Sequence, residues 1–134
     1  MSSYGAFTNS TDYIVAVVLG GTNLPLATTL LAQGLTNSPS TTDVQLSESG
    51  TYRLAYCVRT TAQLLASSRL TVNGSQLNGS ELIPSVATDT YCRTTMATLA
   101  AGDLVRVQLY GLLGAAALLS GPGGVELILE RLAP

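Results

Sequence analysis

The chain alternates short apolar segments with clusters of Gly, Asn and Ser, and its first and last apolar strands carry apolar side chains on both faces. Residues 12–19 form the first of these strands, and residues 125–132 form the last, with Leu127-Ile128-Leu129 at its centre. A small antiparallel sheet is normally wetted on one side, so a doubly apolar strand needs cover from outside its own fold. The pattern therefore predicts obligate assembly, with one sheet face in the core and the other on neighbouring subunits.

Turn signals divide the remaining chain into strands with one buried face. In residues 51–60 and 104–112 apolar and polar side chains alternate, which indicates inner faces that include Tyr52, Tyr56 and Val107. We expect further strands at residues 43–47, 68–72, 90–99 and 115–119.

The expected connections are tight turns with specific chemistry. Asn73-Gly74 is a strong hairpin signal, and Glu48-Ser49-Gly50 predicts a turn in which Gly50 supplies a positive φ. Residues 22–42 contain two prolines and only short apolar pieces, so they predict edge strands and loops, with a short helix at 27–32 as the alternative.

About eight to ten strands without a convincing helix predict an all-β fold, an antiparallel two-sheet jelly-roll sandwich. The 134 residues suffice for one domain over 1–134, with residues 1–10 as a loose N-terminal lead-in. We expect the doubly apolar first and last strands to lie together at the centre of one sheet.

The charge of the chain excludes several classes of partner. Only 10% of the residues are charged, the six basic residues are all arginine, and the net charge is −2. Such a surface offers no basic patch to nucleic acid or anionic lipid, and no segment reaches the ~18 to 20 apolar residues of a membrane span. We therefore expect no nucleic-acid partner and no membrane partner.

The residue types of most catalytic sites are missing. The chain has neither histidine nor lysine, which removes the usual general base, Schiff-base chemistry and the phosphate-loop lysine. Glu126 and Glu130 share a strand face, but roughly 13 Å of strand separates them, beyond the ~5 to 9.5 Å of glycosidase pairs. We expect no catalytic residue, no cofactor and no enzyme activity.

No metal site is expected either. Asp43, Asp89 and Asp103 fall at predicted strand ends, but their spacing does not match a calcium loop, so turn solvation is the preferred interpretation. For Cys57 and Cys92, buried free thiols are the preferred interpretation, with a cross-strand or inter-sheet disulfide as the alternative. Two thiols without histidine supply only half of a structural zinc set.

Four segments carry a resemblance to a known family. They are the acidic-Ser-Gly turn and aromatic strand at 44–54, the strand that ends in Asn73-Gly74, the strand at 104–107, and the terminal strand at 125–133. In these the sequence resembles the C-terminal domain of the BclA-type collagen-like glycoproteins of the Bacillus exosporium, over essentially the whole chain. The resemblance implies a jelly roll similar to those of complement C1q and tumour necrosis factor, assembled as a compact trimer.

The function implied by the resemblance is structural. The domain would be the homotrimeric head of a collagen-like spore-surface (exosporium) glycoprotein, cell-external, setting chain register and forming the outer tip. This chain contains no Gly-X-Y repeat of its own. The alternative is a trimeric adhesin or phage-type receptor-binding module that recognises a glycan or host surface protein, with a sugar-stacking platform at Tyr4, Tyr13, Tyr91 or Tyr110.

The predicted trimer interface follows from the doubly apolar strands and the strand at 51–60. Arg53 and Arg59 would lie near a subunit boundary and pair with Glu126 or Glu130. The residues expected at the trimer interface are Val15, Val17, Leu19, Cys57, Arg59, Tyr110, Ile128, Glu130 and Leu132.

Overall fold

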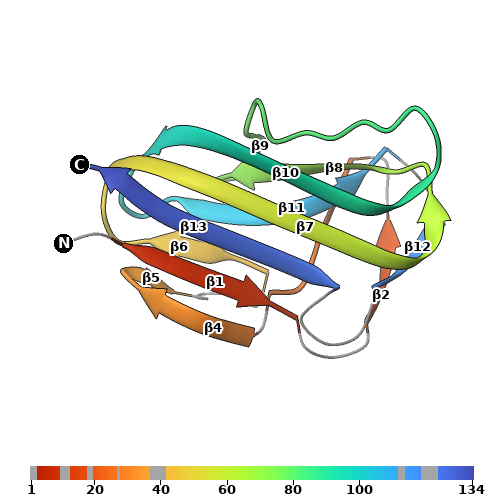
Figure 1. The fold of residues 1–134 in the computed structure, drawn as a ribbon, viewed down its shortest axis with the longest axis horizontal. Helices are drawn as coiled ribbons and strands as arrows, with labels where there is room; N and C mark the ends of the chain where they lie inside the picture. Colours follow the sequence, from red (N-terminus) through yellow and green to blue (C-terminus); the bar gives the residue numbers. More distant parts are fainter. Residues whose placement is uncertain are drawn as a thin grey trace.

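The computed structural model describes residues 3–9, 13–17, 20–26, 28–36, 42–111, 114–118 and 124–134, and their regular structure is entirely β. Two antiparallel sheets pack face to face, which confirms the predicted all-β sandwich (Figure 1). Among the residues described, no helix is long and apolar enough to cross a membrane.

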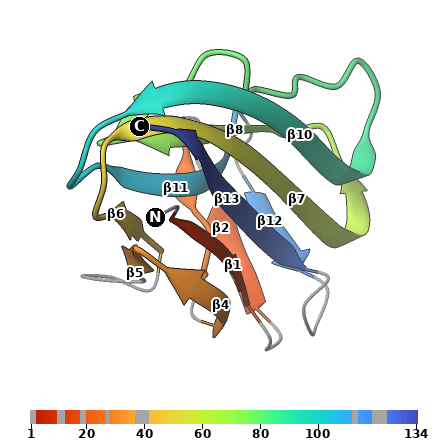
Figure 2. The same cartoon turned by 60° about the vertical axis from the view of Figure 1, so that its left-hand side comes forward.

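The first sheet contains the longest strands. Its order is β2 (Tyr13–Val17), β12 (Gly114–Leu118), β7 (Gly50–Leu64), β13 (Val125–Ala133), β1 (Tyr4–Thr8) and β4 (Thr28–Gln33). Strand β10 (Thr88–Leu99) pairs with β7 along most of its length, so that β10, β7, β13 and β1 lie side by side (Figure 2).

The second sheet is built from shorter strands. Its order is β5 (Leu35–Thr36), β6 (Val44–Leu46), β11 (Leu104–Tyr110), β8 (Ser67–Val72) and β9 (Ser75–Gln76), with β3 (Thr22–Asn23) paired to β11. Within β11 the buried residues alternate with half-buried ones, as the sequence predicted for a half-exposed strand. The turn between β8 and β9 is also confirmed, because Asn73 and Gly74 have φ angles of 53° and 87°, the signs that a type I′ hairpin requires.

The core lies between the two sheets and contains three buried tyrosines. Tyr52 and Tyr56, predicted as core residues, are 0% and 2% exposed, and Tyr91 is fully buried as well. Each ring fills the sandwich while its hydroxyl finds a partner: Tyr56 Oη donates to the Ser80 carbonyl at 2.5 Å and lies 2.8 Å from Ser68 Oγ. The tyrosines thus contribute apolar area without leaving a buried polar atom unpaired.

The start of the chain differs from the sequence prediction. Residues 4–8 form β1, between β13 and β4, and Phe7 is fully buried, so they are not a loose lead-in. The neighbour of the last strand is therefore β1, whereas β2, in the predicted first strand, pairs with β12. Residues 4–8 are stabilised by backbone pairing with β13 and β4. The sequence of five residues alone does not indicate such pairing with distant strands.

Two further expectations are corrected. The helix alternative for residues 27–32 is wrong, because Thr28–Gln33 is the edge strand β4, which pairs with β1. Gly50 has no positive φ; it is the first residue of β7 and is required for a different reason. A Cβ at this position would overlap the Ala133 carbonyl oxygen and lie 2.7 Å from Arg131 Nε.

Gly50→Ala is expected to destabilise the fold, because the added methyl meets backbone of β13 that cannot move without breaking its pairing with β7. Overpacking of this kind costs about 1–3 kcal/mol, which urea unfolding would measure. Gly20→Ala is the matched control, since nothing lies within 4 Å of its added methyl. Equal unfolding midpoints for the two variants would contradict the interpretation.

Tyr56 is expected to make the fold sensitive to alkali. Burial is the main cause that raises the pKa of Tyr56 from 10.0 to about 12, while the hydrogen bond with Ser68 lowers it. The unfolded chain therefore loses this proton first, so the stability contribution is complete below pH 10 and is lost as the pH rises toward 12.

The loss at pH 12 corresponds to roughly 2 kcal/mol for this residue. Unfolding free energies measured from pH 8 to pH 11 should fall less steeply for Tyr56→Phe than for the wild type. A Tyr56→Phe slope as steep as the wild-type one would refute this assignment.

Candidate subunit-contact face

The side of the first sheet that points away from the core carries the candidate functional site. Because side chains alternate along a strand, burial of Tyr52, Leu54 and Tyr56 places the intervening residues of β7 on the opposite side. Strand register then aligns outward-facing residues in rows across β10, β7, β13, β1 and β4. One row consists of Met96, Arg53, Glu130, Tyr4 and Gln33; the next consists of Thr94, Ala55, Ile128, Ala6 and Leu31. We call this surface the outer face.

The outer face is unusually apolar for a surface exposed to water. Leu31 and Met96 are 59% and 60% exposed, and Tyr4 and Ile128 are exposed as well. These four side chains come from four strands that the register brings into two adjacent rows. A grouped apolar surface of this kind typically marks a contact with another macromolecule.

Two shallow hollows lie on either side of Ile128. One, of about 250 Å³, is lined by residues that include Tyr4, Leu31 and Glu130. The other, of about 170 Å³, is lined by residues that include Cys92 and Glu126. Both are smaller than the ~300–1,000 Å³ clefts typical of small-molecule sites, so this relief suits a protein surface better than a cofactor or substrate.

The charges on the outer face are few, and two of them are paired. Arg53 Nε lies 3.0 Å from Glu130 Oε1, so Arg53 pairs with a glutamate of the last strand within the single chain. Both side chains are nearly half exposed, so the pair adds little to the stability of the single chain. The pair lies between Tyr4 and Met96 in the same row, so it places one positive and one negative charge at defined positions on the outer face.

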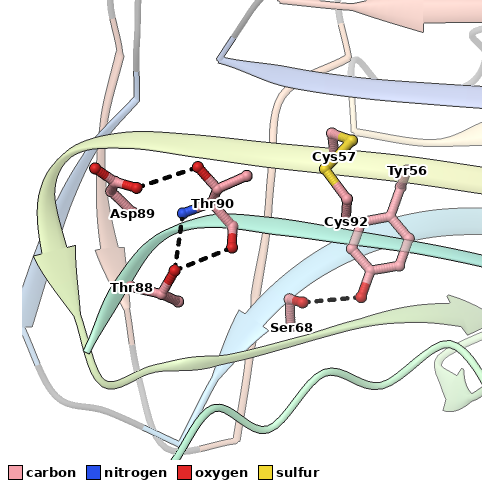
Figure 3. The surroundings of a disulfide bond; sticks show 7 residues. All are labelled: Tyr56, Cys57, Ser68, Thr88, Asp89, Thr90 and Cys92. Carbon is pink, nitrogen blue, oxygen red and sulfur yellow. Dashed lines mark hydrogen bonds between the residues drawn. A yellow bond between two sulfur atoms is a disulfide. The ribbon is translucent and has the colours of Figure 1, made fainter. Parts of the chain in front are cut away.

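Cys57 and Cys92 form a disulfide, so the preferred interpretation as free thiols is wrong and the cross-strand alternative is correct. The two residues are register partners on β7 and β10, with Cα atoms 4.1 Å apart (Figure 3). They occupy the outer face instead of the core, and Cys92 is exposed. The free-thiol interpretation failed because the bond depends on the pairing of β10 with β7, which brings together residues 35 apart in sequence.

The structure places the nine predicted interface residues in different parts of the fold. Cys57, Arg59, Ile128 and Glu130 lie on the outer face, and Leu132 is 48% exposed at the end of β13, beyond a register shift. Two predicted members do not belong there, Val17 and Tyr110, and two lie outside what is described, the side chain of Val15 and all of Leu19.

Val17 and Tyr110 lie away from the outer face, each for a physical reason. Val17 is 2% exposed because it packs in the core between the sheets, which leaves it no surface for a neighbour. Tyr110 is the last residue of β11, in the second sheet, where the Arg69 guanidinium lies 4.0 Å from its ring centroid. Neither residue reaches the outer face.

Sequence reasoning missed Tyr4, Leu31 and Met96. The alternation of Tyr4 and Ala6 with Gly5 and Phe7 was the available signal, but five residues are a short window in which to detect a strand. Met96 lies in a threonine-rich strand, so only the pairing of β10 with β7 reveals that it shares a row with Arg53.

The tyrosines proposed as sugar platforms differ in exposure, and one of them has no open ring face. Tyr91 is fully buried, with its hydroxyl donating to the Leu64 carbonyl, so it offers no open ring face. The ring of Tyr110 is covered on one side by Arg69, Tyr4 belongs to the outer face, and the side chain of Tyr13 lies outside the described part of the structure.

The aspartates at strand ends have structural partners. Asp43 is 3% exposed and forms an ion pair with Arg106, with Oδ1 2.5 Å from Nε. Asp103 accepts hydrogen bonds from Asn73 Nδ2 and from the Ala100 amide, and Asp89 accepts one from Thr90. Across the described parts of the chain, no three His, Cys, Asp or Glu side chains gather as a metal-binding group.

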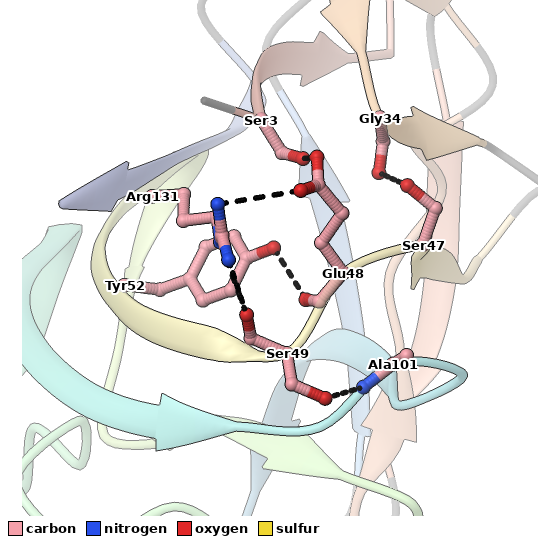
Figure 4. A network of polar contacts seen from close by, with 8 residues as sticks. All are labelled: Ser3, Gly34, Ser47, Glu48, Ser49, Tyr52, Ala101 and Arg131. Carbon is pink, nitrogen blue, oxygen red and sulfur yellow. Dashed lines mark hydrogen bonds and ion pairs between the residues drawn. The ribbon is translucent and has the colours of Figure 1, made fainter. Parts of the chain in front are cut away.

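A second polar cluster ties the two ends of the chain together (Figure 4). Ser3 Oγ donates to Glu48 Oε1 at 2.6 Å, and Arg131 Nη1 lies 3.3 Å from Glu48 Oε2. The hydrogen bond from Ser3 and the charge of Arg131 lower the pKa of Glu48. Arg131 also donates to the Ser49 carbonyl, and its own amide donates to the Ser3 carbonyl. The N-terminal segment, the β6–β7 turn and the last strand therefore meet at one end of the sandwich.

Solved structures place this fold among jelly rolls of the tumour necrosis factor and C1q type. Murine APRIL gives a TM-score of 0.75 at 18% identity, over 98% of this chain and 100% of that one. The Eiger TNF of S. frugiperda gives 0.65 at 14% identity, over 99% and 92% of the chains. Rabbit GITRL gives 0.62 at 12% identity, over 98% and 96%. At such identities the likeness shows the fold alone.

The family of this chain is shown by its sequence. The model of the BclA C-terminal domain matches residues 5–133, so the chain belongs to that family, as the resemblance indicated. A comparison with curated protein sequences gives no match.

Removal of the disulfide is expected to destabilise the fold without abolishing it. Cys57 and Cys92 are 35 residues apart, and closing a loop of that length stabilises a domain by about 3–4 kcal/mol in the chain-entropy account. A Cys57→Ala/Cys92→Ala double variant should unfold at lower urea concentration than the wild type and be indifferent to dithiothreitol. A wild type whose midpoint does not change once mass spectrometry shows both thiols free would contradict this expectation.

Proposed function

We propose that this domain is the homotrimeric head of a collagen-like, cell-external glycoprotein of the bacterial spore surface. In this proposal the outer face is the subunit contact. The observation that carries it is the alignment of Tyr4, Leu31, Met96 and Ile128 on one exposed sheet face. Membership of the BclA C-terminal domain family supports the assignment.

The energetic argument rests on the cost of hydrating that face. Full burial of one large apolar side chain is worth about 1.5–3 kcal/mol relative to exposure. Leu31 and Met96 are 59% and 60% exposed, and Tyr4 and Ile128 are 38% and 36% exposed, so each side chain gains only the part of this value that its exposed fraction represents. The lost rotational and translational freedom must be subtracted from their sum. Burial against copies of the same chain removes the patch from water, and a closed ring does so without open-ended growth.

The positions of the chain ends agree with attachment to a stalk. The N- and C-termini lie at the same end of the sandwich, where the cluster around Glu48 joins Ser3 to Arg131 (Figures 1 and 4). A collagen-like stalk that preceded the domain would enter at this end and leave the opposite end outermost. Three heads held together would raise the effective concentration of the stalk chains and align their register.

The disulfide supports a location outside the cytoplasm. Cross-strand bonds between exposed cysteines persist in oxidising surroundings, whereas cytosolic thiols are normally kept reduced. An exosporium location is consistent with that chemistry. In this proposal the role is one of assembly and surface structure, with no reaction catalysed by the domain.

The adhesin alternative has one observation in its favour. Leu65 directly follows β7 and Val86 precedes β10, so both lie near the end opposite the termini, where they are 56% and 72% exposed (Figure 1). A host protein or glycan would be met first at this end. Binding to immobilised glycans or host surface proteins that Leu65→Ser and Val86→Ser abolish, with assembly unchanged, would favour this alternative.

Ile128→Arg is expected to convert the trimer to a monomer, because it introduces a charge at the centre of the outer face. Sedimentation should give three times the 13.8 kDa chain mass for the wild type and a single chain mass for the variant at micromolar concentration. Val86→Arg is the matched control, since Val86 is exposed and belongs to no strand of the outer face.

A second readout tests the role as a head. With a tract of Gly-Pro-Pro repeats attached before residue 1, the wild-type head should speed triple-helix refolding at least tenfold over the Ile128→Arg head, because tethering raises the effective concentration of the chains. A wild type that stays monomeric at micromolar concentration would overturn the proposed function.

A further inference from the structure

The disulfide occupies a central position on the outer face. Cys57 and Cys92 lie in the row next to the one that contains Ala55, Thr94 and Ile128. The same residues, with Glu126, line the hollow of about 170 Å³ beside Ile128. Cys92 is exposed in the single chain, so a small thiol reaches the bond through this hollow.

We propose that the Cys57–Cys92 disulfide is part of the subunit contact and that its redox state and the assembly of the domain are coupled. A second copy of this chain, seated on the outer face, covers the hollow and shields the bond from thiols. The inference rests on the proposed function, because it uses the same face and the same kind of partner.

The bond also organises the residues that make the contact. Among the residues that the structure describes, strand β10 pairs with β7 alone, and it presents Thr94 and Met96 to the outer face. The disulfide joins β10 to β7 two residues from Thr94, so it holds β10 in register with the centre of the sheet. Loss of the bond frees β10 to separate from β7 and weakens the surface that a second copy must match.

Thermodynamic linkage makes the two effects reciprocal. If the trimer forms more readily from the oxidised chain, the disulfide is correspondingly harder to reduce in the trimer than in the monomer. Shielding adds a kinetic component, because the attacking thiolate must reach a sulfur atom along its exposed side.

Reduction itself follows ordinary thiol–disulfide exchange. A thiolate of dithiothreitol attacks Sγ of Cys92, the more exposed of the two cysteines, forms a mixed disulfide, and releases Cys57 as a thiolate that takes up a proton. The second thiol of the reductant then closes its own ring and releases Cys92. Two electrons pass from dithiothreitol to the protein disulfide, and the reductant leaves as a cyclic disulfide.

The experiment measures the rate of reduction in each assembly state. Wild type and Ile128→Arg receive a fixed pulse of dithiothreitol at a temperature well below both unfolding transitions, and iodoacetamide then traps the new thiols for mass spectrometry. We expect reduction of the wild-type trimer to be at least tenfold slower than that of Ile128→Arg. Dilution of the wild type below its dissociation concentration should raise its rate toward that of the variant, a comparison that needs no substitution.

Val86→Arg controls for the introduced charge and should match the wild-type rate. In the reverse direction, a Cys57→Val/Cys92→Val variant should bind its own copies at least tenfold more weakly, so that its trimer dissociates at a concentration at least tenfold higher than the wild-type trimer does, while circular dichroism retains the β-sheet signal. Should that double variant fail to fold, the dilution series still decides the question.

The outcomes separate this inference from the function on which it rests. If sedimentation shows a wild-type trimer but reduction proceeds at the same rate in trimer and monomer, only the coupling is overturned. If the wild type is a monomer, both are overturned. Slow, concentration-dependent reduction of a sedimenting trimer supports both.

Discussion

The structure depends on strand β7, which packs against the core on one face, contributes to the outer face on the other, and pairs with a different strand along each edge. Its inward residues, Tyr52, Leu54 and Tyr56, are almost completely buried, while Arg53, Ala55 and Cys57 face outward. Along its edges β7 pairs with β13 and β10, and its far end meets β12. A one-residue slip would exchange the two faces, so the register is fixed by the core and transmitted to every row of the outer face.

Much of the fold could be predicted because the alternation is local and strong. In β11 and in the first half of β13, up to Leu129, every second residue is aliphatic, and a hairpin signal such as Asn73-Gly74 acts within four residues. Prediction failed where stability comes from distant partners. Strand β1 is held by β13 and β4, the Cys57–Cys92 bond depends on the β7–β10 register, and Gly50 is required by the approach of Ala133.

In the candidate site, too, the residues marked by local sequence signals could be predicted, and those that depend on distant strands could not. Ile128 could be identified from its own strand, because an aliphatic residue flanked by two buried leucines must face the other way. Arg53 was expected by face and charge to pair with a glutamate of the last strand, and it pairs with Glu130 within the single chain. Val17 was misassigned because alternation does not say which of two apolar faces is the core. Met96 lies in a threonine-rich strand, and its place on the outer face could be recognised only from the pairing of β10 with β7.

The meeting of the two chain ends limits how such a domain can display added sequence. Strand β13 runs back toward the N-terminal segment, and Arg131 is fixed to Ser3 and Ser49 there (Figure 4). A peptide fused after Pro134 would emerge at the base of the sandwich, beside whatever precedes the domain. The connection between β9 and β10, which carries Val86 at the opposite end, is the route by which a guest loop would project outward.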